Sequence, residues 1–145
     1  VERVLCASPD YIAARGHPAD GDALIKDSHE CLNLRYPGAT EFKWRLITTD
    51  GPKRFRVTGR FESDDGDVLT DWALSGNGIV MKPIFEVADY LSSGQLVPVA
   101  ADTPPEPIQM ACLYTHRRRQ DPKTRLFMEY VIARITEKVS GQLPR

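Results

Sequence analysis

The sequence predicts an α/β domain with a mixed β-sheet, and three observations carry this prediction. Short apolar segments of strand length alternate with segments of helical periodicity along the 145 residues. Glycine, proline and capping residues stand at most of the changes between the two kinds of segment. The hydrophobic fraction of 41% is that of an ordinary globular domain, and no internal repeat interrupts the pattern.

Several segments have the features of strands, because they are short, apolar or alternating, and bounded by turn residues. The clearest signal is Asp50-Gly51, which is typical of a tight turn and separates two such segments. The predicted strands are residues 3–7, 31–36, 42–48, 54–61, 79–81, 95–100 and 108–114.

The segments between these strands carry helix start and stop signals. Ser8 is a suitable N-cap, Pro9 fits the first helical position, and Gly16 suits the position after the last turn. Pro83 and Gly94 bracket a later helix in the same way. The predicted helices are residues 9–15, 21–27, 63–75, 83–93 and 122–139.

Two of these helices have patterns that bear on function. Ser63 is expected to open the third helix, whose first turn then holds Asp64, Asp65 and Asp67 near the positive end of the helix dipole. The last helix has an apolar stripe along one side. The stripe consists of Met128, Val131, Ile132, Ile135 and Val139.

The charge distribution argues against a general binder of polyanions. The formal net charge is −1, whereas a nucleic-acid-binding domain usually has an excess of basic residues. The basic segment "THRRRQDPKTR" (115–125) is offset by the acidic segment "ESDDGDVLTD" (62–71). We interpret the run Arg117–Arg119 as a solvated surface turn; contact with an acidic patch of a neighbouring subunit and contact with DNA are the alternatives.

The cysteines indicate free thiols in a reducing compartment. Cys6, Cys31 and Cys112 are three, unevenly spaced, and form no C-x-x-C motif. His29 and Cys31 lack a second ligand pair, so no zinc site is expected. No run approaches the ~20 apolar residues of a membrane span. Because the sequence opens with "VERVLCAS" and no initiator Met, we expect a piece of a longer protein.

Five successive segments resemble the C-terminal effector-binding domain of LysR-type bacterial transcriptional regulators. Each motif alone is weak, but their order and spacing match the family along nearly the whole chain. The segments are "RVLCASPDYIAARGHP", "CLNLRYPG", "FKWRL", "GRFESDDGDVLTDWALSGNGIVMKPIFEVADYLSSGQLVPV" and "LYTHRRRQDPKTRLFMEYV".

This resemblance implies an α/β fold of the periplasmic-binding-protein-like (type II) kind, with two lobes, two crossings and a small-molecule cleft between the lobes. Residues 1–100 would then be the second lobe. Residues 101–145 would be the return crossing with the closing strand and helix of the first lobe. The winged helix-turn-helix of the family would be absent from this chain, so DNA would be bound only through that missing part.

The resemblance also implies a cytoplasmic homo-oligomer without a cofactor that binds a small-molecule effector. If Arg35 and the helix start at Ser63 line the cleft, this effector is an anionic metabolite. Family pockets draw on the strand that here ends in Leu34, Arg35, Tyr36 and Pro37. Arg35 either grips a carboxylate or is an exposed strand residue. Free backbone amides at a helix start bind anions.

Two further groups complete the predicted effector site. Ser63, Asp64 and Asp65 at the third helix either contact the ligand or simply cap the helix. Tyr114 and Thr115 at the return crossing either reach into the cleft or, for Tyr114, pack in the core.

An enzyme and a periplasmic-type solute-binding protein are the alternative classes. Serine, histidine and cysteine side chains are present, but no nucleophile elbow, H-E-x-x-H motif or glycine-rich phosphate loop is found. Gly76-Asn77-Gly78 ends a predicted helix, whereas a phosphate loop opens one. We therefore expect no catalytic turnover. The unpaired cysteines weigh against a secreted binding protein.

Overall fold

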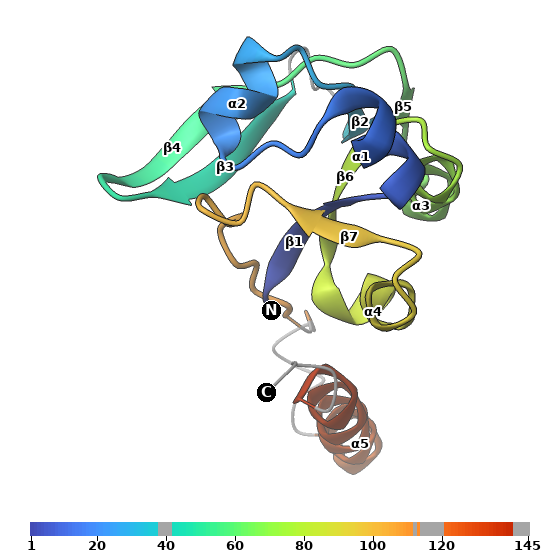
Figure 1. The fold of residues 1–145 in the computed structure, drawn as a ribbon. Helices are drawn as coiled ribbons and strands as arrows, with labels where there is room; N and C mark the ends of the chain where they lie inside the picture. Colours follow the sequence, from blue (N-terminus) through green and yellow to red (C-terminus); the bar gives the residue numbers. More distant parts are fainter. Residues whose placement is uncertain (38–41, 112, 114–120, 141–145) are drawn as a thin grey trace.

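The computed structural model describes residues 1–37, 42–111, 113 and 121–140 (Figure 1). Its helices are α1 (Pro9–Arg15), α2 (Gly21–Lys26), α3 (Gly66–Leu74), α4 (Ile84–Ser92) and α5 (Pro122–Ser140). Its strands are β1 (Arg3–Ala7), β2 (Cys31–Leu34), β3 (Lys43–Thr48), β4 (Gly51–Arg56), β5 (Glu62–Ser63), β6 (Ile79–Pro83) and β7 (Val97–Val99).

A five-stranded mixed sheet organises most of the chain. The strand order is β5-β2-β6-β1-β7. β2 runs parallel to both β5 and β6, whereas β1 runs antiparallel to β6 and β7. The predicted α/β class with a mixed sheet is thus confirmed.

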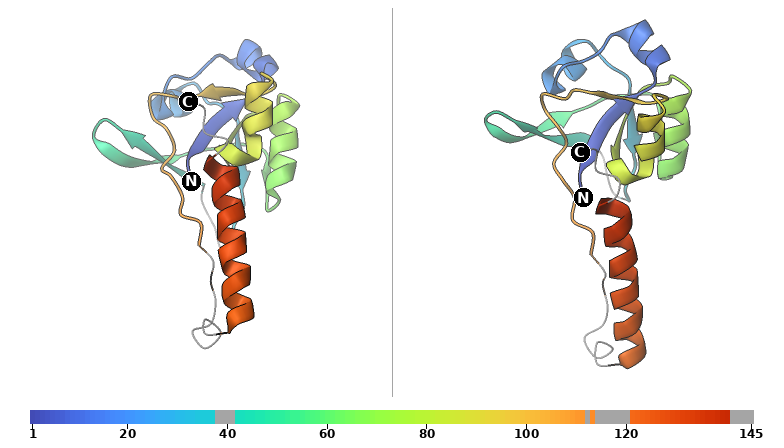
Figure 2. Two further views of the ribbon diagram at one scale, coloured as in Figure 1. Left: turned by 90° about the horizontal axis from the view of Figure 1, so that it is seen from below. Right: turned by 60° about the horizontal axis from the view of Figure 1, so that its bottom comes forward.

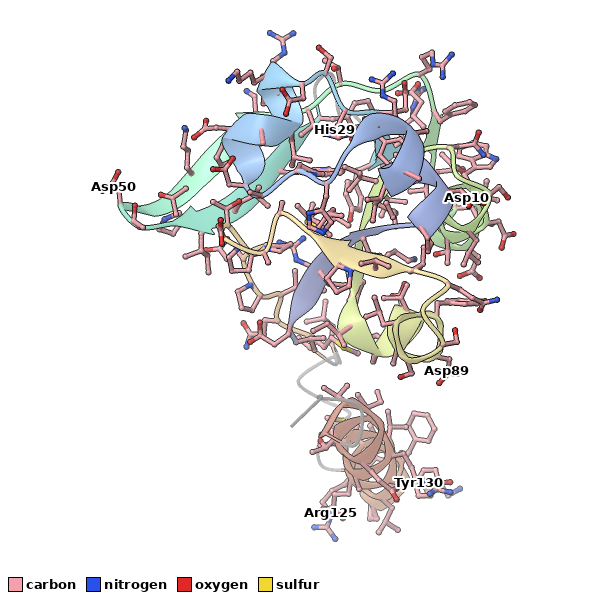
Figure 3. All side chains as sticks on the ribbon, in the orientation of Figure 1. Asp10, His29, Asp50, Asp89, Arg125 and Tyr130 are labelled. Carbon is pink, nitrogen blue, oxygen red and sulfur yellow. The ribbon has the colours of Figure 1, made fainter. Side chains whose placement is uncertain are left out.

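Strands β3 and β4 form a separate antiparallel hairpin with Asp50 near its tip (Figure 3). Trp44 pairs with Phe55 across the hairpin, and both side chains are buried. α2 packs on this face, because a Cβ added to Gly21 would lie 2.8 Å from Leu46 and Phe55 side chains.

The sheet has a hydrophobic cluster on each face because alternate strand residues point to opposite sides. Leu5 and Ala7 of β1 join α1, α2 and the hairpin on one face; Cys6 joins α3 and α4 on the other. Helix α5 extends away from this body (Figure 2). No helix in the described part of the chain is long and apolar enough to span a membrane.

The start of the third helix differs from the prediction. The helix begins at Gly66 with Asp65 as N-cap, and the Asp65 carboxylate accepts from the amide of Asp67 at 2.8 Å. Ser63 belongs instead to β5, where it pairs with Leu34. Ser63 was predicted as the cap because both residue types are good caps; strand pairing, which the local sequence does not reveal, excludes it.

Two predicted strands also require correction. β4 covers 51–56 where residues 54–61 were predicted, because pairing with β3 starts directly at the turn with Thr48↔Gly51. The described residues of segment 108–114 are not a strand. Only Ile108 has a backbone partner there, exchanging hydrogen bonds with Val1. A strand needs a neighbour along its length, and none is placed beside this segment within the described residues.

Candidate ligand-binding cleft

A cleft of about 230 Å³ lies at the edge of the sheet where β2 and β6 end. β1 is antiparallel to β6 and pairs Arg3 with Pro83, so β1 begins at this same edge. Open α/β sheets bind ligands beyond the carboxyl ends of their strands. The cleft is lined by Arg3, Leu32, Leu34, Tyr36, Phe42, Lys43, Trp44, Arg45, Leu69 and Met81.

Arg3 is the half-buried cation of this cleft. Its Nε and Nη2 donate to the main-chain oxygen of Glu106 at 2.8 and 2.5 Å. Burial lowers the pKa of Arg3, while Tyr36 and Glu106 oppose that shift. Arginine nevertheless stays protonated and has five N–H donors, so donors remain for an anion.

Two further cations stand beside Arg3 in the lining, Lys43 and Arg45 of β3. The Nε of Arg45 lies 3.0 Å from a carboxylate oxygen of Glu106. The lining also contains apolar side chains, among them Leu32, Leu69 and Met81. Such a cleft suits a small molecule with one anionic end and one apolar surface.

Two residues of the predicted strand end, Leu34 and Tyr36, line the cleft. Arg35 does not, because neighbouring residues of an extended chain point to opposite sides. Its guanidinium forms an ion pair with Glu62, and its amide donates to the Ser63 oxygen at 2.8 Å. Pro37 is exposed and lies outside the lining.

The start of α3 is closed by the protein's own groups. The Asp65 carboxylate accepts from the amides of Asp67 and Val68, and Ser63 Oγ accepts from the Asp65 amide. Asp64 is exposed. Ser63, Asp64 and Asp65 are not among the cleft residues. Of the three residues, Asp65 has the capping role, whereas Ser63 lies in β5.

The remaining predicted positions lie outside the described residues. These are Tyr114, Thr115, the run Arg117–Arg119 and Cys112. The two described cysteines, Cys6 and Cys31, are buried, and burial raises the pKa of each thiol to about 12. Both are therefore protonated at neutral pH and unsuited to nucleophilic attack. Within the described ranges, no three His, Cys, Asp or Glu residues are grouped to hold a metal ion.

Sequence reasoning missed Arg3, Lys43 and Arg45. Arg3 lies in the segment "RVLCASPDYIAARGHP", and Lys43 and Arg45 lie in "FKWRL", but neither segment marks these three residues as ligand contacts. Only the antiparallel position of β1 in the sheet, and the packing of the hairpin against that edge, bring them together. The basic alternation of "KWRLIT" was the one available signal, because it places Lys43 and Arg45 on one face.

Comparison with known proteins gives a consistent result along the chain. The LysR substrate binding domain family matches residues 1–136. The HTH-type transcriptional regulator DmlR of Escherichia coli is 31% identical over 132 residues, which are 89% of this chain and 41% of that protein. The chain thus spans less than half the length of the curated relatives that it matches.

Solved structures of regulators have the same fold. The CrgA regulatory domain of Neisseria meningitidis has a TM-score of 0.72 at 25% identity, covering 92% of this chain and 64% of that chain. Full-length AphB, a virulence activator of Vibrio cholerae, has a TM-score of 0.74 at 28% identity, covering 99% and 46%. These relatives are transcriptional regulators and not enzymes. The chain belongs to the LysR substrate-binding domain family of transcriptional regulators.

Proposed function

We propose that the cleft at the sheet edge is the effector site of a LysR-type regulator and that its effector is a small anion. The observation that carries this proposal is the half-buried guanidinium of Arg3. It lines the cleft and has N–H donors beyond those that bind the main-chain oxygen of Glu106. Lys43 and Arg45 add positive charge on the same side. Leu34 and Tyr36 supply apolar contact and a hydroxyl.

The effector acts by shifting a conformational population. In this proposal residues 1–100 form the second lobe, and residues 101–145 supply the return crossing and part of the first lobe. A ligand that binds one lobe arrangement more tightly biases the hinge by its difference in affinity. A separate DNA-binding part of the cytoplasmic, oligomeric parent then responds.

A thermal-shift screen tests the charge of the effector. Small organic acids should raise the melting temperature, whereas amines of similar size should not. Arg3→Gln should weaken the best acid by about tenfold to a hundredfold, the range for a charge-assisted hydrogen bond. Arg54→Gln removes an exposed guanidinium that is not in the lining, and should leave the affinity unchanged.

The outcomes separate the candidate arginines. Binding of amines alone, or equal acid affinity in wild type and Arg3→Gln, would contradict the proposal. Arg35→Ala is the informative comparison, because its side chain pairs with Glu62 in the structure. A loss as large as that of Arg3→Gln would assign Arg35 to the site as well.

A further inference from the structure

Glu106 contacts two of the three cations of the cleft without lining the cleft itself. Its main-chain oxygen accepts from Arg3 at 2.8 and 2.5 Å. Its carboxylate lies 3.0 Å from Nε of Arg45. The same residue therefore orients one guanidinium through its backbone and neutralises the other through its side chain.

The backbone around Glu106 is held in place independently of these contacts. The Glu106 amide donates to the Arg45 oxygen at 3.0 Å, and the Ile47 amide donates to the Pro104 oxygen at 2.8 Å. Ile108 exchanges hydrogen bonds with Val1 at 3.0 and 2.6 Å. Because the segment is fixed on both sides of Glu106, its carboxylate is presented to Arg45 as a built-in counter-charge.

A counter-charge at this place affects anionic and neutral ligands differently. An anion that enters the cleft has to compete with the Glu106 carboxylate for the guanidinium of Arg45. A neutral ligand meets no such penalty. The side chains of Arg45 and Glu106 are 49% and 33% exposed, so solvent screens the effect and keeps it modest.

We propose that Glu106 is a positioning residue that sets the charge selectivity of the cleft. Its main-chain oxygen orients the guanidinium of Arg3 toward an anion, and its carboxylate weakens the binding of that anion to Arg45. This inference rests on the proposed anion site. Segment 104–108 would then influence which ligands bind, although none of its residues lines the cleft.

Glu106→Gln separates the two contacts, because it removes the charge and keeps the main-chain oxygen that binds Arg3. Sulfate serves as the anionic probe, titrated into the 145-residue protein at constant ionic strength. Glu106→Gln should bind sulfate about two- to fivefold more tightly than wild type, as expected for removal of a partly exposed charge. Asp22→Asn is the matched control, since it removes the carboxylate of the 3.0 Å Lys53–Asp22 pair, which joins α2 to strand β4 of the hairpin.

A double-mutant cycle shows whether the gain passes through Arg45. In the Arg45→Gln background, Glu106→Gln should produce no further gain in sulfate affinity. A ligand-free measurement accompanies it: the Nε–H of Arg45 should exchange with water faster in Glu106→Gln than in wild type, by NMR. This readout reports the contact even if no anion binds.

The outcomes distinguish this inference from the proposed function. If Arg3→Gln abolishes sulfate binding but Glu106→Gln gives no gain, the anion site stands and the role of Glu106 is wrong. If Glu106→Gln still increases the sulfate affinity in the Arg45→Gln background, the proposed role of Glu106 is also wrong. If Arg3→Gln binds sulfate as wild type does, or if no variant binds sulfate, both statements fail.

Discussion

A buried hydrogen-bonded pair, Tyr11 and His29, joins α1 to the start of β2. The Tyr11 hydroxyl accepts from the Glu30 amide at 2.9 Å and shares a second hydrogen bond, of 3.1 Å, with Nδ1 of His29. His29 is only 3% exposed and lies inside the body of the molecule (Figure 3). Burial lowers the pKa of His29, with Arg15 acting in the same direction and Asp27 opposing it.

This lowered pKa predicts a loss of stability in mild acid. As the pH falls below about 6.5, the unfolded chain takes up a proton at His29 before the folded chain does. The contribution of His29 to the free energy of unfolding is therefore complete above that pH. It is lost as the pH falls toward the lower pKa that His29 has in the folded chain. Urea unfolding at about pH 7.5 and about pH 5.5 measures it.

The control for this prediction is His29→Gln, which does not titrate. Its free energy of unfolding should fall less between the two pH values than that of wild type. Equal losses in the two proteins would show that other groups cause the pH dependence.

Single residues of the cleft were predictable only where a local pattern points to them. Leu34 and Tyr36 followed from the strand end, and both line the cleft. The orientation of Arg35 depends on its partner Glu62, which lies 27 positions further along the chain (62 minus 35). Arg3 could not be found locally, because its place depends on which strands flank β1.

At the scale of elements, the start of α3 depends on one carboxylate. Asp65 accepts from two backbone amides of the first turn, at 2.8 and 3.5 Å. Asp65→Ala should therefore lower the free energy of unfolding by about 0.5–2 kcal/mol, the usual cost of losing an N-cap. Asp64→Ala, which removes an exposed neighbouring carboxylate, should change it much less. Equal effects of the two substitutions in urea unfolding would contradict the assigned cap.

The β2 strand starts between two close backbone segments, which explains two glycines. A Cβ on Gly59 would lie 1.9 Å from the Cys31 oxygen, and one on Gly78 would lie 2.6 Å from the Glu30 oxygen. In the sequence, Gly78 is a helix-end signal and Gly59 lies inside the predicted strand 54–61. The sequence does not show that a neighbouring backbone excludes any side chain there, because that contact is made by distant segments.

At the scale of the whole molecule, α5 leaves apolar surface uncovered within the described structure. Phe127 is 66% exposed, and Tyr130 projects from α5 into solvent (Figure 3). A groove of about 780 Å³ separates α5 from segment 107–111. Of the predicted stripe, Val131, Ile132, Ile135 and Val139 line this groove. Apolar surface of this kind usually marks a contact site.

We therefore expect the 145-residue protein to self-associate through α5. Light scattering across a dilution series should show that the apparent mass of the protein decreases as the protein is diluted. Ile132→Glu and Ile135→Glu should shift the protein toward monomer, because a charge in an apolar contact is costly to desolvate. A monomer at all concentrations, with a protease-resistant α5, would show that the helix is covered by its own chain.

The overall architecture was more predictable than its outer part. Alternating segment types predicted the mixed sheet, and the resemblance predicted the family; both are confirmed. Segment 108–114 read as a strand by composition, but its described residues have no strand beside them. The composition of a segment indicates that it has apolar side chains to bury. A strand also needs a second strand to pair with, and the composition of the segment does not show whether one lies beside it.

The central claim is that a small anion binds at the sheet edge through Arg3, and chemical-shift mapping by NMR tests it most directly. The tightest organic acid from the thermal-shift screen is titrated into ¹⁵N-labelled wild type and Arg3→Gln. We expect the largest amide shifts at Arg3, at 34–36 and at 43–45, and we expect Arg3→Gln to need about ten to a hundred times more acid to reach them. Shifts concentrated at the start of α3 or along α5, with the cleft unchanged, would contradict it.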